Sequence, residues 1–330
     1  MSLLSSIFAL FLALLLDHRF GEVPRWHPLA GFGKLASALE KSLNHGAPKK
    51  QFWLGIFAWS LLVGVPTLLT FGISYGVQQM SPVASSAYWH IPFDAIILYF
   101  CIGYRSLCDH TTPIAKALEQ AQQTSESHAI EQARNLTGRI VSRDTHAMTE
   151  VQCSRAAIES LLENGNDALF ATLFWYLLLG PAGAILHRLA NTLDAMWGYH
   201  NNRFEFFGKG AARIDDVLAY IPARLTALSY ALTGKPIPAL RCWAQHASRL
   251  ASPNGGPCMS AGAGSLGISL GGPCRYHGQL MMKPFFGTGP APAAADIFRA
   301  QQLLRRSLLL WLAVLGASAG WVLWNTMVTP

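Results

Sequence analysis

The sequence predicts an all-α fold: a polytopic helical integral membrane protein with cytoplasmic helical loops and a re-entrant segment. Of its 330 residues, 51% are hydrophobic and only 13% are charged, whereas a soluble domain carries about 25% charged residues. The mean hydropathy is +0.27. So few charged side chains cannot cover a soluble globule of this size, and we therefore expect lipid to cover part of a single membrane-embedded domain over residues 1–330.

Several apolar runs approach the roughly 20 residues that a helix needs to cross a bilayer. The predicted spans are 3–16, 52–77, 88–108, 168–186 and 308–328. The first lacks the basic segment and the small-residue cleavage site of a signal peptide, so we expect it to be a retained span. A weaker sixth candidate, 217–232, is interrupted by Pro222 and Arg224, and 284–295 is expected to be a loop before the last helix.

The basic residues predict the orientation of these spans. Loops 17–51 and 105–165 contain lysine and arginine, whereas loop 78–92 contains neither. Basic loops favour the cytoplasmic side, so the first two are expected inside and the third outside. The sequence thus predicts a multi-pass protein of the cell (inner) membrane, with its functional site facing the cytoplasm.

The fourth stretch carries the break Gly180-Pro181-Ala182-Gly183. A simple crossing at 168–186 would place Arg188, Arg203, Lys209 and Arg213 outside, which the charge rule disfavours. A re-entrant pair of short helices would return the chain to the cytoplasmic side, provided that protein or a watery cavity surrounds the turn. We prefer the re-entrant alternative to the simple crossing.

A polar helix is predicted just before this stretch. Thr149 and Gln152 fit a capping box, so a helix should begin near Glu150 and end at Asn164-Gly165. Arg155, Glu159 and Glu163 then share one face, since they are four residues apart. This row is either a solvated face with ion pairs, or it allows Glu159, Glu163 and Asp167 to hold a divalent cation such as Mg²⁺.

Two further segments carry polar or glycine-rich patterns. Asn191 and Asp194 lie three apart, and Asp215-Asp216 precede an apolar run. Such residues either cap helices at the membrane interface or face a cavity or a partner. The glycines of 252–272 do not form a Walker A loop, and close packing of small residues explains 261–267 equally well.

Other classes of protein receive little support. The net charge of +7 arises from lysines and arginines beside the apolar runs, so membrane topology explains it better than nucleic-acid binding. The six cysteines form no CxxC pair, and neither an HExxH nor a GxSxG motif is present. A cysteine-based metal site, a zinc protease and a serine hydrolase are therefore unsupported.

Taken in order, the polar segments resemble the CobD/CbiB family of membrane-bound adenosylcobinamide-phosphate synthases over nearly the whole length. The matching motifs are Leu16-Asp17 with 21–24 and His27-Pro28, 141–145, 159–167, 191–199, 213–225, Ser252-Pro253-Asn254 and 270–273. The chain departs from the family pattern at Glu22, Ala30, Lys34, Ser142, Gly165, Ala195, Met259 and Cys274. The first motif is the one most altered.

The resemblance implies an amide-forming synthase. It would join adenosylcobyric acid to an amino-alcohol phosphate, such as (R)-1-amino-2-propanol phosphate, to give adenosylcobinamide phosphate, with ATP as co-substrate and Mg²⁺ as cofactor. The partners that the resemblance implies are the corrinoid, the amino-alcohol phosphate and the bilayer, and nucleic acid is not among them. A homo-oligomer and an association with other cobalamin-pathway enzymes are both compatible with this function. An AmpE-like membrane signalling paralogue and a corrinoid transporter are the alternatives.

Under this hypothesis each predicted site residue has a role. The candidates for catalysis are Glu163, Asp194, Asp215 and Asp216. Those for the metal are Glu159, Glu163 and Asp167. Those for substrate or phosphate binding are Arg143, Asp144, Asn164, Asn191, Arg213, Arg224, Ser252 and Asn254. We expect these side chains to converge in one pocket on the inner-leaflet side of the membrane.

Overall fold

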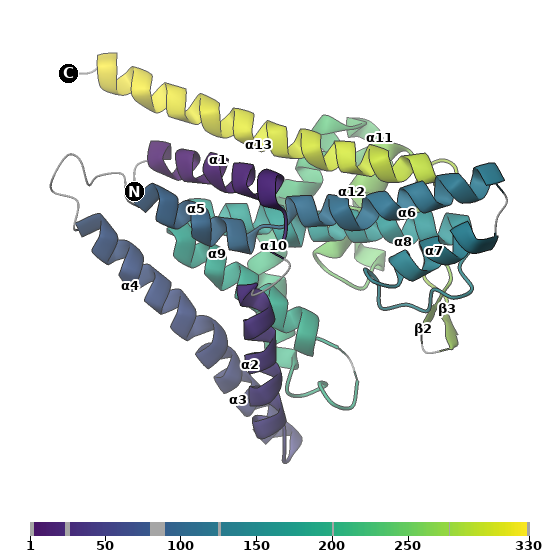
Figure 1. Cartoon of the computed structure of the whole chain (residues 1–330), viewed down its shortest axis with the longest axis horizontal. Helices are drawn as coiled ribbons and strands as arrows, with labels where there is room; N and C mark the ends of the chain where they lie inside the picture. The colour runs from purple at the N-terminus through teal and green to yellow at the C-terminus, as the bar shows by residue number, and fades with distance from the viewer. Residues whose placement is uncertain are drawn as a thin grey trace. The chain divides into compact units, whose positions relative to one another are not determined.

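The structure is a computed structural model that describes residues 3–23, 27–79, 90–124, 127–199, 201–276 and 278–328 (Figure 1). These residues are mostly helical, as predicted, and among them five helical segments are long and apolar enough to cross a membrane. The chain forms two compact units. The first comprises Met1–Tyr104, Asp167–Ala219 and Leu315–Pro330, and the second comprises Arg105–Asn166 and Tyr220–Val314.

The first unit gathers four helices of the apolar runs. Helix α1 (Leu3–Phe20) packs on α5 (His90–Cys101), and α9 (Ala171–Trp197) contacts both α5 and α4 (Val65–Gln79). Helix α3 (Pro48–Trp59) and the π-helical turn Ser60–Gly64 continue into α4 as one long helix, and α2 (Pro28–Leu43) contacts α3 and α9. The buried core of this region centres on Trp197 and Phe207, whose rings lie 5.0 Å apart.

Helix α9 is a hairpin. Gly180 has φ 64° and ψ −154°, which interrupts the helix in front of Pro181. Thr172 and His187, fifteen residues apart, are joined by a hydrogen bond of 3.0 Å between Oγ1 and Nδ1, although 15 residues of straight helix would span about 22 Å. Gly183 packs directly against the backbone carbonyl of Trp175. The chain therefore turns back at Gly180, which is the geometry predicted for a re-entrant segment.

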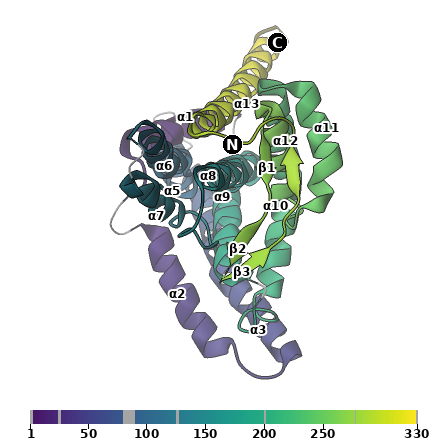
Figure 2. The same cartoon turned by 90° about the vertical axis from the view of Figure 1, so that its right-hand side faces the viewer.

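The second unit is a helical layer with a small β structure. Its helices are α6 (Tyr104–Thr124), α7 (Ser127–Thr137), α8 (Glu150–Gly165), α11 (Pro236–His246) and α12 (Gly255–Leu266). Helix α12 lies between α8 and α11 (Figure 2). Its glycines allow this close approach, because a Cβ on Gly264 would overlap Ala239 and one on Gly262 would overlap Leu162. Packing of small residues is thus the correct interpretation of 261–267.

Two helices, α10 (Lys209–Thr233) and α13 (Ala294–Val328), contribute residues to both units. The uncertain sixth span, 217–232, lies in α10, and this helix is not among the five that are long and apolar enough to cross a membrane within the described residues. Pro222 and Arg224 keep its hydropathy low. Residues 88 and 89 of the third predicted span, and 80–89 of the predicted outside loop, lie outside the described residues.

Four short strands were not predicted. Strand β1 (Ser269–Gly271) pairs antiparallel with β4 (Phe285–Gly287), and β2 (Cys274–Tyr276) pairs antiparallel with β3 (Gln279–Met281). Gly271, Gly272 and Gly278 have φ between 76° and 90°, a conformation that glycine adopts without strain. Strand β4 therefore replaces part of the loop expected at 284–295.

The α-helix α8 ends at Gly165, as predicted, but the chain does not leave the helical path there. The capping box is present, with Thr149 and Gln152 bonded to each other's backbone, so the predicted start is confirmed. After Gly165, however, the helical backbone continues through the π-helical segment Asn166–Phe170. Gly165 serves close packing and not termination, because a Cβ there would lie 2.5 Å from the Tyr230 hydroxyl and 2.7 Å from Leu304 Cδ1.

Candidate functional site

The first unit contains a cluster of carboxylates around Asp215. Asp215, on α10, is 7% exposed and accepts a hydrogen bond from the side chain of Asn191 on α9. The aspartates whose charges act on Asp215 are Asp167, Asp194 and Asp216. Asp215 Oδ1 is buried and has no hydrogen-bond partner among the described residues. The predicted residues Asp167, Asn191, Asp194 and Asp215 are thus brought together within one unit.

Burial and mutual repulsion set the protonation of this cluster. Burial, followed by the charges of Asp167 and Asp194, raises the pKa of Asp215 to about 9, and the hydrogen bond from Asn191 only partly opposes this shift. Burial also raises the pKa of Asp216. At neutral pH, Asp215 therefore holds a proton unless a cation or a substrate charge replaces it.

A half-buried arginine lies near this cluster. The charge of Arg188 interacts with those of Glu22 and Asp167, and its Nε has no hydrogen-bond partner among the described residues. It also reaches His27, whose pKa is lowered mainly by burial and further by Arg188, while Glu22 acts in the opposite direction. His27 Nδ1 caps α2 by accepting from the Leu29 amide at 3.2 Å. The first motif of the sequence thus packs next to the acidic cluster.

In the second unit, the start of α12 holds a separate polar group. Arg224 donates to Asn254 Oδ1 at 2.7 Å and to the Pro253 carbonyl at 3.1 Å, with its guanidinium 3.5 Å from the centre of the Tyr220 ring. Ser252 Oγ accepts from the Gly255 amide at 2.8 Å. A Cβ on Gly255 would overlap Glu163 Oε1. Four predicted residues, Glu163, Arg224, Ser252 and Asn254, therefore meet at this helix start.

The predicted metal ligand Glu159 is engaged by the protein itself. One carboxylate oxygen accepts from Arg143 at 2.6 Å and the other accepts from the Gly271 amide at 2.7 Å. Both side chains of the ion pair are largely buried, with 15% of Arg143 and 8% of Glu159 exposed. The pair ties α8 to the segment around β1, and it occupies the guanidinium that we expected to bind phosphate.

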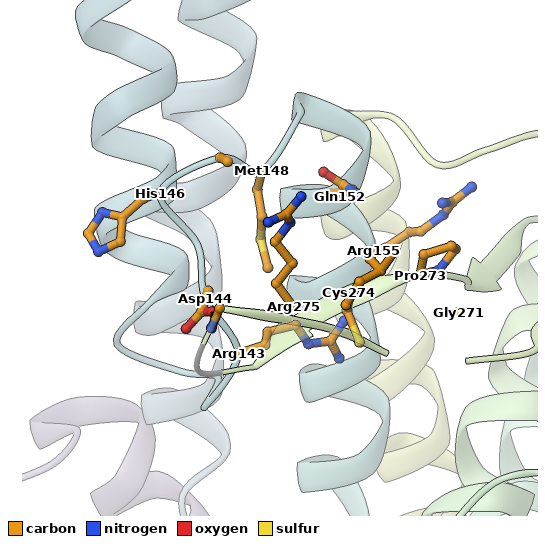
Figure 3. Close-up of a pocket in the computed structure, with 13 residues that line it drawn as sticks. Arg143, Asp144, His146, Met148, Gln152, Arg155, Gly271, Pro273, Cys274 and Arg275 are labelled. Atoms are coloured by element: carbon orange, nitrogen blue, oxygen red, sulfur yellow. Dashed lines mark hydrogen bonds between the residues drawn. The ribbon is translucent and has the colours of Figure 1, made fainter. Parts of the chain in front are cut away.

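A cavity of about 290 Å³ opens beside this pair (Figure 3). Asp144 and His146 lie at one end, Arg155, Gly271 and Pro273 at the other, and Arg275 lies between them near Gln152. Asp144 Oδ2 accepts from the Gly278 amide at 2.6 Å, and its own amide donates to the Arg275 carbonyl at 2.8 Å. The cavity therefore carries both signs of charge.

Its two remaining arginines were missed by the sequence analysis. Arg155 Nε is 3.4 Å from the Ser269 carbonyl, and its guanidinium lies 5.0 Å from the centre of the Phe285 ring. Arg275 is exposed on β2. Neither forms an ion pair within the described residues. The sequence places Arg155 on one helix face with Glu159 and Glu163 without marking it as a site residue, whereas nothing in the sequence marks Arg275 or Arg188 as one.

The implied Mg²⁺ was tested against the carboxylates present. The part of the chain that the structure describes contains no group of three or more histidines, cysteines, aspartates or glutamates arranged to hold a metal ion. The trio Glu159, Glu163 and Asp167 is therefore not a preformed metal site, since Arg143 already neutralises Glu159. Asp167 and Asp194, whose charges act on Asp215, fit a cation that takes one or two carboxylates and substrate phosphates.

Two predicted residues lie apart from these groups. Asn164 donates to the Ser160 carbonyl at 2.8 Å and lines another cavity, of about 230 Å³, with His110 and Arg139. It is adjacent to Glu163, but successive helical residues point about 100° apart, so the two side chains diverge. Arg213 is exposed on α10.

Comparison with known proteins agrees with these motifs. The family model described as CobD/Cbib protein matches residues 10–304. A relative from Chromobacterium violaceum named "Cobalamin biosynthesis protein CobD" is 47% identical over 94% of this chain and 96% of the relative. Proteins of the same name from Stutzerimonas stutzeri and Mycobacterium tuberculosis are 46% and 35% identical, over 94% and 88% of the chain and 96% and 88% of the relatives. No solved structure matches the chain.

Proposed function

Because this chain belongs to the CobD/CbiB family of cobalamin biosynthesis proteins, we propose that it is the synthase that joins adenosylcobyric acid to an amino-alcohol phosphate. The observation that supports this most directly is the carboxylate cluster around Asp215. Amide formation requires a group that removes a proton from an alkylammonium, and a means of activating the corrinoid carboxylate with ATP.

Asp215 suits the proton transfer. An alkylammonium has a pKa of about 10, as in lysine, and burial holds the pKa of Asp215 at about 9. A general base is most effective when its pKa lies near the operating pH, so the raised pKa of Asp215 suits this role better than that of an ordinary aspartate. In the proposed reaction the corrinoid carboxylate takes a phosphoryl group from ATP and releases ADP, or takes an adenylyl group and releases pyrophosphate. Ionised Asp215 accepts one proton from the ammonium, the amine nitrogen forms the C–N bond, and phosphate or AMP leaves with the second N–H proton.

Asp194 and Asp167 are the proposed partners of Mg²⁺ in this unit, since both approach Asp215. Bound Mg²⁺ would neutralise phosphate oxygens of ATP. The charge of Arg188 interacts with those of Asp167 and Glu22. Arg188 would hold Asp167 in place when no substrate is bound. We further propose that this site faces the cytoplasm, where ATP is available and where the basic loops place it.

A feeding experiment tests the proposal. We expect a strain deleted for this chain to make cobalamin when it is supplied with cobinamide but not when it is supplied with cobyric acid, because only the amide-forming step is missing. Complementation with the wild-type chain should restore growth on cobyric acid. Normal cobalamin production from cobyric acid in the deletion strain would exclude the synthase, provided that no second copy is encoded.

A transporter is the second candidate, because the hairpin at Gly180 lies near the buried Asp94, whose Oδ2 accepts from Tyr176 at 3.4 Å. Broken helices beside intramembrane charges are typical of secondary transporters. The same experiment separates the two functions. A transporter mutant would lose cobalamin production by failing to take up the corrinoid supplied, and cell-associated label from a labelled corrinoid would fall.

A further inference from the structure

One side of α10 in the second unit carries large apolar side chains that are not covered by the rest of the chain. The exposed residues of this stripe are Ile221, Leu225, Leu228 and Leu232. They follow one another at intervals of three or four residues, which places them on one side of the helix. The opposite side is buried and carries the small residues Ala223, Ala227 and Ala231. Large apolar residues outside and small ones inside are typical of a helix that packs closely on its neighbours and faces lipid.

Helix α11 repeats this arrangement. Ile237 and Leu240 are exposed, whereas Ala239 is fully buried on the side where α11 packs on α12 (Figure 2). Only two residues, Gly234 and Lys235, separate α10 from α11. The two stripes therefore follow one another along the chain. We call the exposed side chains at 221, 225, 228, 232, 237 and 240 the apolar face.

The apolar face adjoins α13, a helix that is long and apolar enough to cross a membrane. Trp311 Nε1 donates to Ser229 Oγ at 2.8 Å, and the hydroxyl oxygens of Thr233 and Ser307 lie 2.9 Å apart. These contacts occur in opposite order along the two helices, so α10 and α13 are locally antiparallel. Leu309, between the two contacts on α13, is 53% exposed. Lipid that covers Leu309 would therefore also reach this end of α10.

Helix α10 itself does not have the character of a spanning helix. It is not among the five helical segments that could cross a membrane within the described residues. Its part of the apolar face extends from Ile221 to Leu232, which is about 17 Å of helix, whereas the hydrocarbon layer is about 30 Å thick. A helix with such a short apolar face lies in the surface layer of the membrane, with that face toward the acyl chains.

The charged residues beside the apolar face are basic. Residues 217–295 and 297–330 contain no aspartate or glutamate. Lys235, Arg305 and Arg306 are exposed, and each is within two residues of the hydroxyl contact between α10 and α13. None of the three forms an ion pair within the described part of the chain. Anionic phospholipid headgroups attract lysine and arginine side chains that lie close to the membrane surface.

We infer that the apolar face lies in the surface layer of the membrane, and that Lys235, Arg305 and Arg306 bind anionic phospholipid headgroups there. This inference concerns how the second unit is held on the bilayer, and it does not depend on the proposed function. A second copy of the chain or another protein could cover the same face. Such a partner would have to displace the lipid that the span-forming helix α13 requires at Leu309.

The first test measures what touches the apolar face in the full-length chain reconstituted in lipid nanodiscs. A fluorophore is attached to Leu232→Cys or to Leu240→Cys in a Cys108→Ser background, because the other five cysteines are buried. Lipids that carry a nitroxide near the headgroup should quench both labels, and aqueous iodide should not. A control label at Gln132→Cys, exposed on α7, should respond in the opposite way.

The second test measures the headgroup preference at the Leu232→Cys label. Nitroxide-labelled phosphatidylglycerol should associate about 5-fold or more better than nitroxide-labelled phosphatidylcholine, and added salt should reduce this preference. The triple variant Lys235→Gln/Arg305→Gln/Arg306→Gln should lower the preference by about 5-fold or more. Arg139→Gln, which removes an exposed arginine in the loop after α7, should leave it unchanged.

Three results would overturn the inference. Quenching of both labels by iodide would place the apolar face in water. Protection of both labels from iodide and from both lipids would assign the face to a second copy of the chain or to another protein. Equal quenching by the two lipids, with no effect of the triple variant, would show contact with lipid but no recognition of anionic headgroups.

Discussion

At the scale of single residues, Asp215 is the side chain whose surroundings differ most from those of an exposed carboxylate. It is 7% exposed, lies among three other aspartates, and has one oxygen without a partner among the described residues. An isolated buried charge is costly, so these surroundings favour the protonated form. The same features that make Asp215 suitable for proton transfer should therefore reduce stability at alkaline pH.

Replacing Asp215 by asparagine should raise stability and remove activity. The pKa of Asp215 is about 9 in the folded chain and about 3.9 when unfolded. Between about pH 3.9 and about pH 9, the folded chain therefore keeps a proton on Asp215 that the unfolded chain has lost. The free energy of unfolding thus falls as pH rises through this window. We expect Asp215→Asn to unfold at a higher temperature than the wild type at pH 8, and the difference to disappear near pH 4.

The measurement is thermal unfolding of both proteins in the same detergent across this pH range. Asp109→Asn is the control, because Asp109 is about half exposed in a surface pair with Arg105 and should change the melting temperature little. A melting temperature for Asp215→Asn that is lower than the wild type's at pH 8 would contradict the buried, protonated state of Asp215.

Gly255 should be essential at the start of α12. A methyl group there would overlap Glu163 Oε1 and lie 3.1 Å from Ser252 Oγ, so Gly255→Ala should displace the carboxylate and reduce turnover by about 10-fold or more. Gly316→Ala, in a helix with open space around the site, should retain wild-type turnover. The measurement is the rate of product formation at equal amounts of inserted protein; equal rates for the two variants would remove Glu163 from the site.

At the scale of elements, the hairpin of α9 depends on one backbone conformation. Gly180 has φ 64° and ψ −154°, a region that is essentially restricted to glycine. We expect Gly180→Ala to destabilise the protein by about 1–3 kcal/mol, seen as a lower melting temperature in detergent. Gly72→Ala, in the open middle of α4, should be neutral or slightly stabilising. A fall of the same size in both would argue against the turn at Gly180.

Glu159 on α8 holds the preceding loop through its ion pair with Arg143 and β1 through the Gly271 amide, and it should be structural. Glu159→Ala leaves a largely buried guanidinium and the Gly271 amide without their acceptor, which should cost about 3–5 kcal/mol. Glu131→Ala removes a more exposed pair with Arg134 and should cost less than about 1 kcal/mol. Chemical unfolding in detergent measures both; similar values would show that the Glu159 pair is not effectively buried.

The elements that the sequence predicts well are those whose signal is local. The capping box predicts the start of α8, and the Gly-Pro break predicts the turn in α9, because both depend on neighbouring residues. The π-helical continuation after Gly165 and the packing role of this glycine were not predicted, since that role depends on the distant Tyr230 and Leu304. The four strands were missed because three-residue strands between glycines have no detectable periodicity.

At the scale of the whole molecule, the predicted site residues fall into two compact units. Asp167, Asn191, Asp194, Arg213, Asp215 and Asp216 belong to the first, and the remaining eight belong to the second. In the first unit the sequence identified the aspartates that gather around Asp215, because aspartates beside apolar runs are conspicuous. It did not identify the cavity arginines Arg155 and Arg275, since their shared position depends on how the strands fold back on α8.

The most direct test is reconstitution of the reaction with the purified chain in detergent, with ATP, Mg²⁺, adenosylcobyric acid and an amino-alcohol phosphate. The wild type should form adenosylcobinamide phosphate, detected by mass, at a rate that rises from pH 7 to 9 as Asp215 loses its proton. The rate of Asp215→Asn should be at least about 100-fold lower than that of the wild type, and it should no longer rise between pH 7 and 9. No product from the wild type, or an unchanged rate and pH profile in Asp215→Asn, would contradict the account.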